Sequence, residues 1–259
     1  MAEQSPDELI LLERVGHVAV LTINRPHHRN AFDLATARAM EAAVDSFEAD
    51  PALRVAVLTG AGGTFSAGQD LKAAARGEIA RTERRGGCGI MLEPPTKPVI
   101  AAVEGHALGG GLELCLACDL IVAARDATMG LPEASRAVPA MGGGLFRLPR
   151  RIPYHRAMEL AITGKPLSAE QFHTLGLVNR LTEPGQARAV ALELAEEVAA
   201  NGPVAVQASA AVVRRSQEWG DRESWELQTP LIEPVLVSED FKEGLAAFAE
   251  KRAPIWKGR

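Results

Sequence analysis

Two glutamates are candidates for proton transfer, because each occurs where a charged side chain is not expected. Glu113 is the only charged residue between Ala107 and Cys118, and Glu133 follows Pro132 twenty residues further along the chain. The ordinary interpretation of both is a carboxylate in the first turn of a helix, where the helix dipole favours it. We favour a functional interpretation of Glu113, since a lone acid in an apolar segment is costly to bury unless it is paired or used in chemistry.

Two glycine-rich segments could supply backbone amides to a ligand. Gly109–Gly111 precede an apolar run, which predicts a helix whose first N–H groups are free to bind a polarised oxygen. Residues 60–71 directly follow a predicted strand, and an ordinary strand-to-helix turn is the alternative there. This second segment does not match three known motifs. A Walker A loop would need lysine at Gln69, a dinucleotide fingerprint would need glycine at Phe65, and a nucleophile elbow would need glycine at Thr64.

Two carboxylates and two amide donors form a chemically complete set for one reaction. Adding water across a double bond next to a thioester needs amides that stabilise the carbonyl oxygen, one acid for the water proton and one for the α-carbon proton. No metal or redox site is expected, because Cys115 and Cys118 form a C-x-x-C pair without a second pair. A serine hydrolase using Ser66 and His106 is a weaker alternative, because the elbow pattern fails.

The elements that must position these residues follow an α/β pattern. Short β-branched runs next to Gly, Pro or Asn predict five strands. These cover residues 18–23, 55–59, 99–103, 120–124 and 177–181. The apolar spacing over Leu34–Ala49 predicts a helix with Asp33 as its N-cap. The intervening segment Ala73–Gly89, with four arginines and a Gly-Gly pair, is the most loop-like long stretch, and we expect it to be mobile.

From about Arg156 onward the pattern predicts mostly helices. Ser168 and Gln171 form a capping-box signature, and residues 186–201 form an alanine-rich helix that ends at Asn-Gly-Pro. The last part, Trp219–Arg259, contains all three tryptophans of the chain. It holds more apolar surface than a terminal appendage can hide alone, so we expect it to pack against another subunit.

Composition excludes several classes of protein. The 259 residues carry a formal net charge of −5 and 4% aromatic side chains, which argues against a nucleic-acid partner. No apolar stretch reaches the length of a membrane span, and the acidic N-terminal segment does not resemble a signal peptide. Three cysteines are too few for a disulfide framework, so we expect a reducing, cytoplasmic location.

Six motifs, in the expected order, give this sequence a resemblance to the enoyl-CoA hydratase/isomerase (crotonase) superfamily. They are Ile23-Asn24-Arg25-Pro26 with Asn30-Ala31, Phe65 to Leu71, Lys97 to Val103, Gly105 to Glu113, Pro132-Glu133, and the tail from Glu243-Gly244 to Lys251-Arg252. The resemblance implies an α/β fold, a crotonase-like spiral of repeated ββα units with a C-terminal helical trimerisation region. We expect a core domain over residues 1–190 and an oligomerisation region over residues 191–259.

The resemblance also implies an enzyme that acts on coenzyme A thioesters. It assigns catalysis to Glu113 and Glu133 and the oxyanion amides to Ala67 and Gly110. The substrate would contact Ala67, Gln69, Asp70, Leu71 and Gly109, with Phe248 and Lys251 near the adenosine end of CoA, often from a neighbouring subunit. No separate cofactor or metal is implied, since CoA is part of the substrate, and the partner is a second copy of the chain in a trimer or a dimer of trimers.

Retention of both acids favours reversible syn hydration of a 2-enoyl-CoA, with Glu113 activating water and Glu133 protonating the α-carbon. The segments 66–75 and 247–259 resemble the carnitinyl-CoA dehydratase branch, although no aromatic cage for a quaternary ammonium is evident. An isomerase and a non-catalytic acyl-CoA-binding relative are also compatible with membership of this superfamily. Phe146 stands within the segment that usually reads Gly-Gly-Thr-x-Arg-Leu, and we expect it to reshape the acyl pocket.

Overall fold

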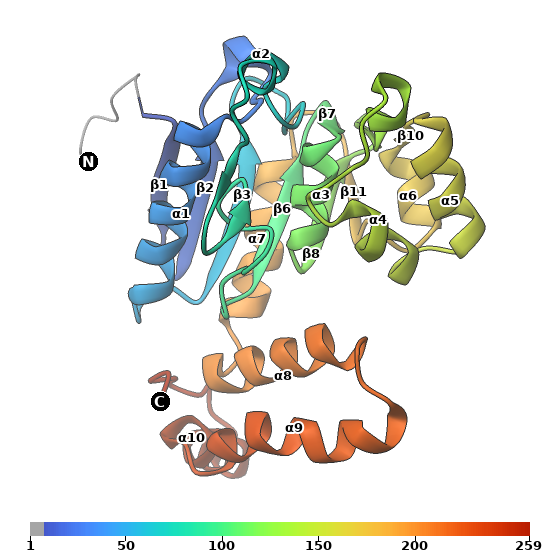
Figure 1. Ribbon diagram of the computed structural model, residues 1–259. Helices are drawn as coiled ribbons and strands as arrows, with labels where there is room; N and C mark the ends of the chain where they lie inside the picture. The colour runs from blue at the N-terminus through green and yellow to red at the C-terminus, as the bar shows by residue number, and fades with distance from the viewer. Residues whose placement is uncertain (1–7) are drawn as a thin grey trace.

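The computed structural model describes residues 8–259, and the first seven residues, part of the acidic N-terminal segment, lie outside that range. Its main element is a six-stranded sheet in the order β1-β2-β3-β6-β8-β11 (Figure 1). Only the β1–β2 pair is antiparallel. The strands are β1 (Ile10–Val15), β2 (Val18–Ile23), β3 (Val55–Gly60), β6 (Val99–Val103), β8 (Leu120–Ala124) and β11 (Arg180–Thr182).

Four of the five predicted strands are confirmed to within one residue, and the fifth is displaced. The segment predicted over residues 177–181 pairs only from Arg180 to Thr182. Leu177 and Val178 instead donate to Phe172 O, which closes the turn after the preceding helix. Their apolar side chains are buried there, so hydrophobicity alone did not distinguish this turn from a strand.

Short second strands produce the repeated ββα units. After β6 the chain forms β7 (His106–Leu108) and then helix α3 (Gly110–Ala117), and after β8 it forms β9 (Thr128–Gly130) and then the 3-10 helix η2 (Pro132–Arg136). β7 and β9 pair with each other, and β9 also pairs with β10 (Leu167–Ser168). After β3, Ser66 bridges to Ala107 before helix α2 (Leu71–Ala75). The expected crotonase-like architecture is confirmed.

Helices cover both faces of the large sheet. α1 (Leu34–Ala49) has the predicted N-cap, Asp33, whose side chain accepts a hydrogen bond from Thr36 N. α7 (Ala187–Ala199) covers the opposite face (Figure 1). Because side chains alternate along a strand, Leu21 of β2 is buried on the α1 side of the sheet and Val20 on the α7 side. The remaining core helices are η1 (Pro26–His28), α4 (Gly144–Arg147), η3 (Leu148–Arg150), α5 (Tyr154–Thr163) and α6 (Ala169–Thr174).

The predicted capping box of α6 is present, with Ser168 and Gln171 exchanging hydrogen bonds. The prediction of a long loop over Ala73–Gly89 is wrong in part. The segment contains the end of α2 and a hairpin of β4 (Arg81–Thr82) and β5 (Gly86–Gly87). The hairpin is tied to α1, because Arg85 donates to Asp45 from a buried position.

Three further helices form a separate group below the core, α8 (Pro203–Ser216), α9 (Asp221–Leu236) and α10 (Glu239–Glu250) (Figure 1). Arg214 of α8 joins this group to the core through two hydrogen bonds to Asp119, at 2.7 and 2.6 Å. The domain boundary expected at residue 190 falls inside α7, whose later residues Ala191 and Ala195 still pack against the sheet. Within residues 8–259, no helix is both long and apolar enough for a bilayer crossing.

Asn30 is a buried polar residue that fixes the loops at the carboxyl end of β3. Its side chain accepts from Arg25 N and donates to Ala61 O and Thr64 O, both at 2.8 Å. Its own carbonyl accepts from the Ser66 hydroxyl, and its φ of 53° lies in the left-handed region that asparagine tolerates better than alanine.

We expect Asn30→Ala to lower the free energy of unfolding by about 2–4 kcal/mol, because it leaves buried backbone groups unpaired. Urea denaturation measures the change. Asn24→Ala is the matched control, since Asn24 donates one exposed side-chain hydrogen bond to Glu8 O, and it should cost no more than about 1 kcal/mol. Equal losses in the two variants would contradict a structural role for Asn30.

Candidate active site

Glu113 lies in the first turn of α3 and is buried, with 4% of its surface exposed. Burial raises the pKa of its carboxyl group, and the amides of Gly144 and Gly142 and the charge of Arg147 oppose that rise. Gly144 N donates to Oε1 at 2.9 Å. A Cβ at Gly142 would lie 2.7 Å from Oε2, so glycine is needed for the turn to approach the carboxylate. The amides and Arg147 stabilise the ionised form, but burial outweighs them and the pKa of Glu113 is raised on balance.

Glu133 occupies the first turn of η2. Within residues 8–259, its buried Oε2 has no hydrogen-bond partner. Burial raises the pKa of this carboxyl, and the negative charge of Glu113 raises it further. A Cβ at Gly109 would lie 3.1 Å from Glu133 Oε1, so this carboxyl reaches the N-cap of α3. The two predicted acids therefore meet at one helix terminus.

The N-terminus of α3 offers free backbone donors. Gly109 N pairs with Gly130 O, and no acceptor for Gly110 N is found in the described chain. A Cβ on Gly68 would lie 2.8 Å from Gly110 N, so the 66–70 segment passes directly over this terminus. Gly68 has a φ of 87°, and a side chain is thus excluded by both conformation and contact.

The structure does not leave the amide of Ala67 free, which corrects the expected oxyanion pair. Ala67 N donates to Arg29 O at 3.0 Å, whereas Ser66 N donates to His106 O. Successive N–H groups of an extended segment point to opposite sides, so the Ala67 amide is directed into the neighbouring loop. Gln69 N has no acceptor among residues 8–259, which makes it the available donor beside Gly110.

The remaining residues expected to contact substrate have varied surroundings. The Gln69 side chain donates to Glu78 O, Asp70 caps α2 by accepting from Lys72 N and Ala73 N, and Leu71 is exposed. Phe248 and Lys251 lie in α10 and at its C-terminal end, far from α3 of the same chain (Figure 1). A single chain therefore does not bring these two residues to the glutamates.

The serine hydrolase hypothesis lacks the required contact. Ser66 Oγ donates to Asn30 O and accepts from Gly68 N, so it shapes the loop and has no base beside it. His106 is exposed. The structure thus uses Ser66 to hold the backbone that covers the α3 terminus.

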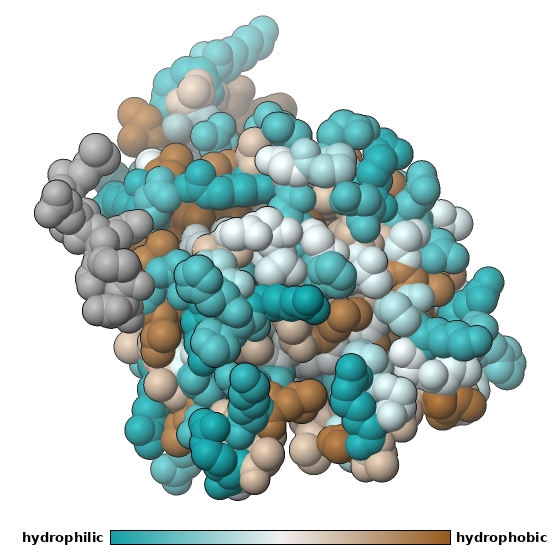
Figure 2. Space-filling model, turned by 90° about the horizontal axis from the view of Figure 1, so that it is seen from above, coloured by the Kyte–Doolittle hydropathy of each residue, from teal (hydrophilic) through white to brown (hydrophobic). Residues whose placement is uncertain are grey.

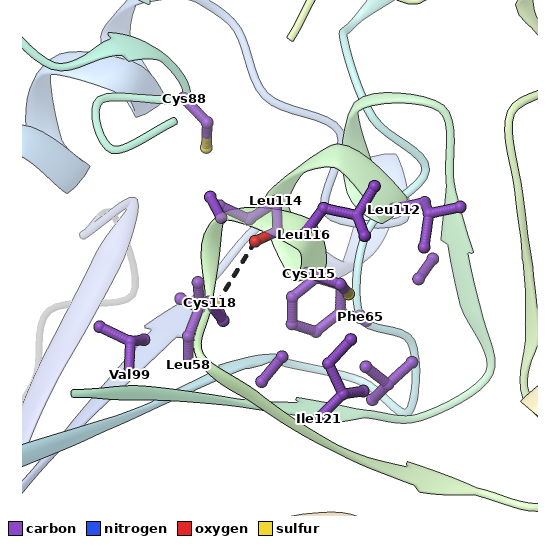
Figure 3. Close-up of a cluster of buried hydrophobic side chains, with 14 of the residues drawn as sticks. Leu58, Phe65, Cys88, Val99, Leu112, Leu114, Cys115, Leu116, Cys118 and Ile121 are labelled. Carbon is purple, nitrogen blue, oxygen red and sulfur yellow. Dashed lines mark hydrogen bonds between the residues drawn. The ribbon is translucent and has the colours of Figure 1, made fainter. Parts of the chain in front are cut away.

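The three cysteines lie in apolar surroundings. Cys88, Cys115 and Cys118 are buried and free, and burial raises the pKa of each thiol. Figure 3 shows them among hydrophobic side chains, where Cys118 Sγ donates to Leu114 O. No cluster of three or more potential metal ligands occurs in the part of the chain that the structure describes.

Arg147 is a functional candidate that the sequence did not single out. Its guanidinium donates to Met91 O at 2.6 Å and to Gly142 O at 3.4 Å. It therefore links the segment after the β4–β5 hairpin to the glycine turn whose amides face Glu113. Its position shortly after Gly142–Gly144 is the only signal in the sequence, and glycine turns do not by themselves indicate a buried cation.

A cavity of about 580 Å³ opens beside the two acids and includes Glu133 and Gly144 in its wall. Its other walls come from η2, the following loop, α4, η3 and α5. Phe146 does not line it, contrary to expectation, because its ring lies against the guanidinium groups of Arg147 and Arg150 at 5.5 and 6.0 Å. Seen from above, the face at the carboxyl ends of the parallel strands is mostly hydrophilic or neutral, with scattered hydrophobic residues (Figure 2).

Known proteins resemble this chain over nearly its whole length. The profile of the family described as enoyl-CoA hydratase/isomerase matches residues 13–259. Enoyl-CoA hydratase EchA19 of Mycobacterium tuberculosis is 41% identical over 99% of this chain and 98% of that protein. Carnitinyl-CoA dehydratase of Salmonella typhi is 42% identical over 97% of this chain and 99% of its own length.

Solved structures agree with these sequence relatives. A crystal structure of an enoyl-CoA hydratase from Mycobacterium tuberculosis H37Rv superposes with a TM-score of 0.95 and 51% identity, covering 98% of this chain and 100% of that one. A carnitinyl-CoA hydratase from Mycobacterium avium gives a TM-score of 0.77 and 41% identity, covering 97% and 99% of the two chains.

The positive charge of Arg147 opposes the rise that burial causes in the pKa of Glu113. We therefore expect Arg147→Met to raise that pKa further. Arg147→Lys should leave it nearer the wild-type value, since the charge is kept. Carbon-13 NMR titration of glutamate carboxyls measures it, with Glu113→Gln assigning the signal. Glu133 and Arg151 also face this region and are unchanged in both variants. An unchanged titration in Arg147→Met would mean that Arg147 only supports the loop.

Proposed function

Because the chain belongs to the enoyl-CoA hydratase/isomerase family, we propose that it catalyses the reversible syn addition of water to a 2-enoyl-CoA thioester. One observation carries the proposal: among the described residues, the buried carboxyl of Glu113 and the half-buried carboxyl of Glu133 lie at a helix N-terminus whose first amide has no acceptor. CoA enters as part of the substrate, and the chemistry requires no separate cofactor or metal.

The amides of Gln69 and Gly110 are the proposed oxyanion donors, in place of Ala67 and Gly110. They would donate to the thioester carbonyl oxygen, where negative charge develops when water adds to the β-carbon. The N-terminus of α3 adds the positive end of its dipole at the same point. Both donors are backbone groups held by close glycine contacts, so they are already in position before substrate binds.

The environments of the two acids differ, although burial raises the pKa of both. Glu113 accepts from Gly144 N and lies near Arg147; both contacts stabilise its carboxylate, so we assign it the proton of water. Within residues 8–259, Glu133 has an unpaired oxygen and a negative neighbour; both favour its neutral form, so we assign it the proton that goes to the α-carbon. Two carboxyls in different environments commonly divide acid and base roles in this way.

The retained acids also distinguish hydration from isomerisation and from simple binding. An isomerase needs one group to move a proton between two carbons, and it has no need of a second carboxylate to activate water. A non-catalytic acyl-CoA-binding protein needs neither acid, and burying two unused carboxyls would be costly. Hydration is the reaction that uses every element of this site.

We expect Glu113→Gln and Glu133→Gln each to lower kcat by roughly 10²-fold or more, because each removes a positioned proton-transfer group. Acyl-CoA affinity should change little, since glutamine keeps the shape of glutamate. The double variant should be hardly slower than either single one, because the acids act as a unit. Crotonyl-CoA hydration followed by absorbance provides the rates, and wild-type rates in both variants would rule out the mechanism.

The two single variants also separate the roles of the acids. Exchange of the α-proton of a saturated acyl-CoA with deuterated water should be abolished in Glu133→Gln. It should persist in part in Glu113→Gln, whose acid acts on water. The reverse pattern would exchange the two assignments without affecting the hydratase proposal.

We infer that the chain assembles as a trimer or a dimer of trimers through α8–α10. Trp225, Val237 and Phe248 are 75%, 75% and 87% exposed in the single chain, which is unusual for such large apolar residues. Assembly would also let Phe248 and Lys251 reach the CoA of a neighbouring subunit. The buried free thiols support a reducing compartment, and we propose the cytoplasm.

Sedimentation velocity should show a trimer or hexamer for the wild type. Trp225→Glu should shift the sedimentation toward that of the monomer, because it places a charge in a contact that assembly would bury. Arg222→Ala on the same helix should leave the assembly unchanged. An active wild-type monomer would refute the assembly.

A further inference from the structure

The cavity beside Glu133 has an apolar wall. Apart from Glu133 and the hydroxyl of Tyr154, every side chain in that wall is apolar, and no lysine, arginine or histidine is present. The wall is formed by Leu131, Glu133, Ala134, Ala137, Val138, Pro139, Ala140, Gly144, Leu145, Leu148, Pro149, Tyr154, Ala157, Met158, Ala161 and Ile162. The described residues around this space therefore offer almost no polar partner to a ligand.

The reaction centre borders the cavity at Glu133 and Gly144. Glu133 lines the cavity with a buried oxygen that has no partner in residues 8–259. Gly144, whose amide holds Glu113, lines the same space. An acyl chain whose α-carbon lies at Glu133 therefore has this cavity directly beside it.

On this basis, and resting on the hydratase function proposed above, we propose that the acyl group is an uncharged hydrocarbon considerably longer or bulkier than four carbons. The cavity volume of about 580 Å³ falls within the range of about 300–1,000 Å³ that whole small-molecule ligands occupy. A four-carbon acyl chain would leave most of that space empty. Leu145, Tyr154 and Ile162, exposed by 46%, 60% and 68% in the free chain, provide apolar surface for the distal part.

The same wall disfavours charged acyl groups. A trimethylammonium group is usually held by several aromatic faces or a nearby anion, and this cavity has one aromatic ring, Tyr154, at its exposed rim. Its one acid, Glu133, is needed as a proton donor. A carboxylate on the acyl chain would find no cation in the wall. The chain thus differs in predicted substrate from relatives named carnitinyl-CoA dehydratase.

A panel of trans-2-enoyl-CoA substrates tests the proposal with the full-length wild-type enzyme. Each methylene added beyond crotonyl-CoA should raise kcat/KM by up to about fourfold until the cavity is filled. Six added methylenes set an upper limit of about 4 × 10³-fold, and we expect a ten-carbon enoyl-CoA to exceed crotonyl-CoA by about 10²-fold or more within that limit. Crotonobetainyl-CoA and a carboxylate-terminated enoyl-CoA should be poorer than crotonyl-CoA. Equal or better rates with either charged substrate would overturn the proposal.

Ala161 on α5 allows a direct test of the cavity wall. Ala161→Trp should lower the ratio of kcat/KM for the ten-carbon substrate to that for crotonyl-CoA by at least about tenfold, because it fills distal space. Thr163→Trp, on the same helix but outside the wall, should leave the ratio within about twofold. An unchanged ratio in Ala161→Trp, in a variant with native circular dichroism, would place the acyl group elsewhere.

Failure of this inference is distinguishable from failure of the hydratase function. If no enoyl-CoA of the panel is hydrated, the proposed reaction is wrong and the acyl preference falls with it. If crotonyl-CoA is hydrated with the expected dependence on Glu113 and Glu133 but longer chains give no gain, the reaction stands and the acyl inference is overturned.

Discussion

The structure depends on the close approach of two backbone segments, residues 66–68 and the N-terminus of α3. Gly68 lies against Gly110, and Gly111 lies against Ser66, where an added Cβ would meet Ser66 O at 2.3 Å. Side chains at these positions would push the segments apart. Among the described residues, the first amide of α3 is left without an acceptor, next to the buried Glu113 and the half-buried Glu133.

The ββα repeat explains why residues distant in the sequence meet there. Each repeat places one strand in the large sheet and a shorter one in the small sheet, and a helix then begins at the same edge. Glu113 and Glu133 lie in the first turns of the helices that end successive repeats, α3 and η2. They are therefore separated by about one repeat.

Sequence patterns predicted the elements whose signals are local. The helix over Leu34–Ala49, its Asp33 cap and the capping box at Ser168 depend on residues three or four apart, and all are confirmed. The displaced fifth strand depends on pairing with the distant β8, which periodicity does not record. The hairpin at Arg81–Gly87 is local, but its strands of two residues each are too short to show a periodic pattern. The two acids were found because they interrupt apolar or glycine-rich stretches. Which amide is free depends on the direction of each N–H, which the sequence does not give. The resemblance implied the Ala67 amide as an oxyanion donor, whereas the hydrogen bonds of the structure favour the Gln69 amide.

The buried cysteines allow a chemical measurement of how the core around α3 opens. Cys115 and Cys118 sit at the end of α3, and Cys88 lies in the segment between the β4–β5 hairpin and Met91. Since all three thiols are inaccessible and their pKa values are raised, alkylating reagents reach them only when the packing around the helix separates. Their labelling rates under native conditions therefore report the free energy of local opening around the helix that carries Glu113.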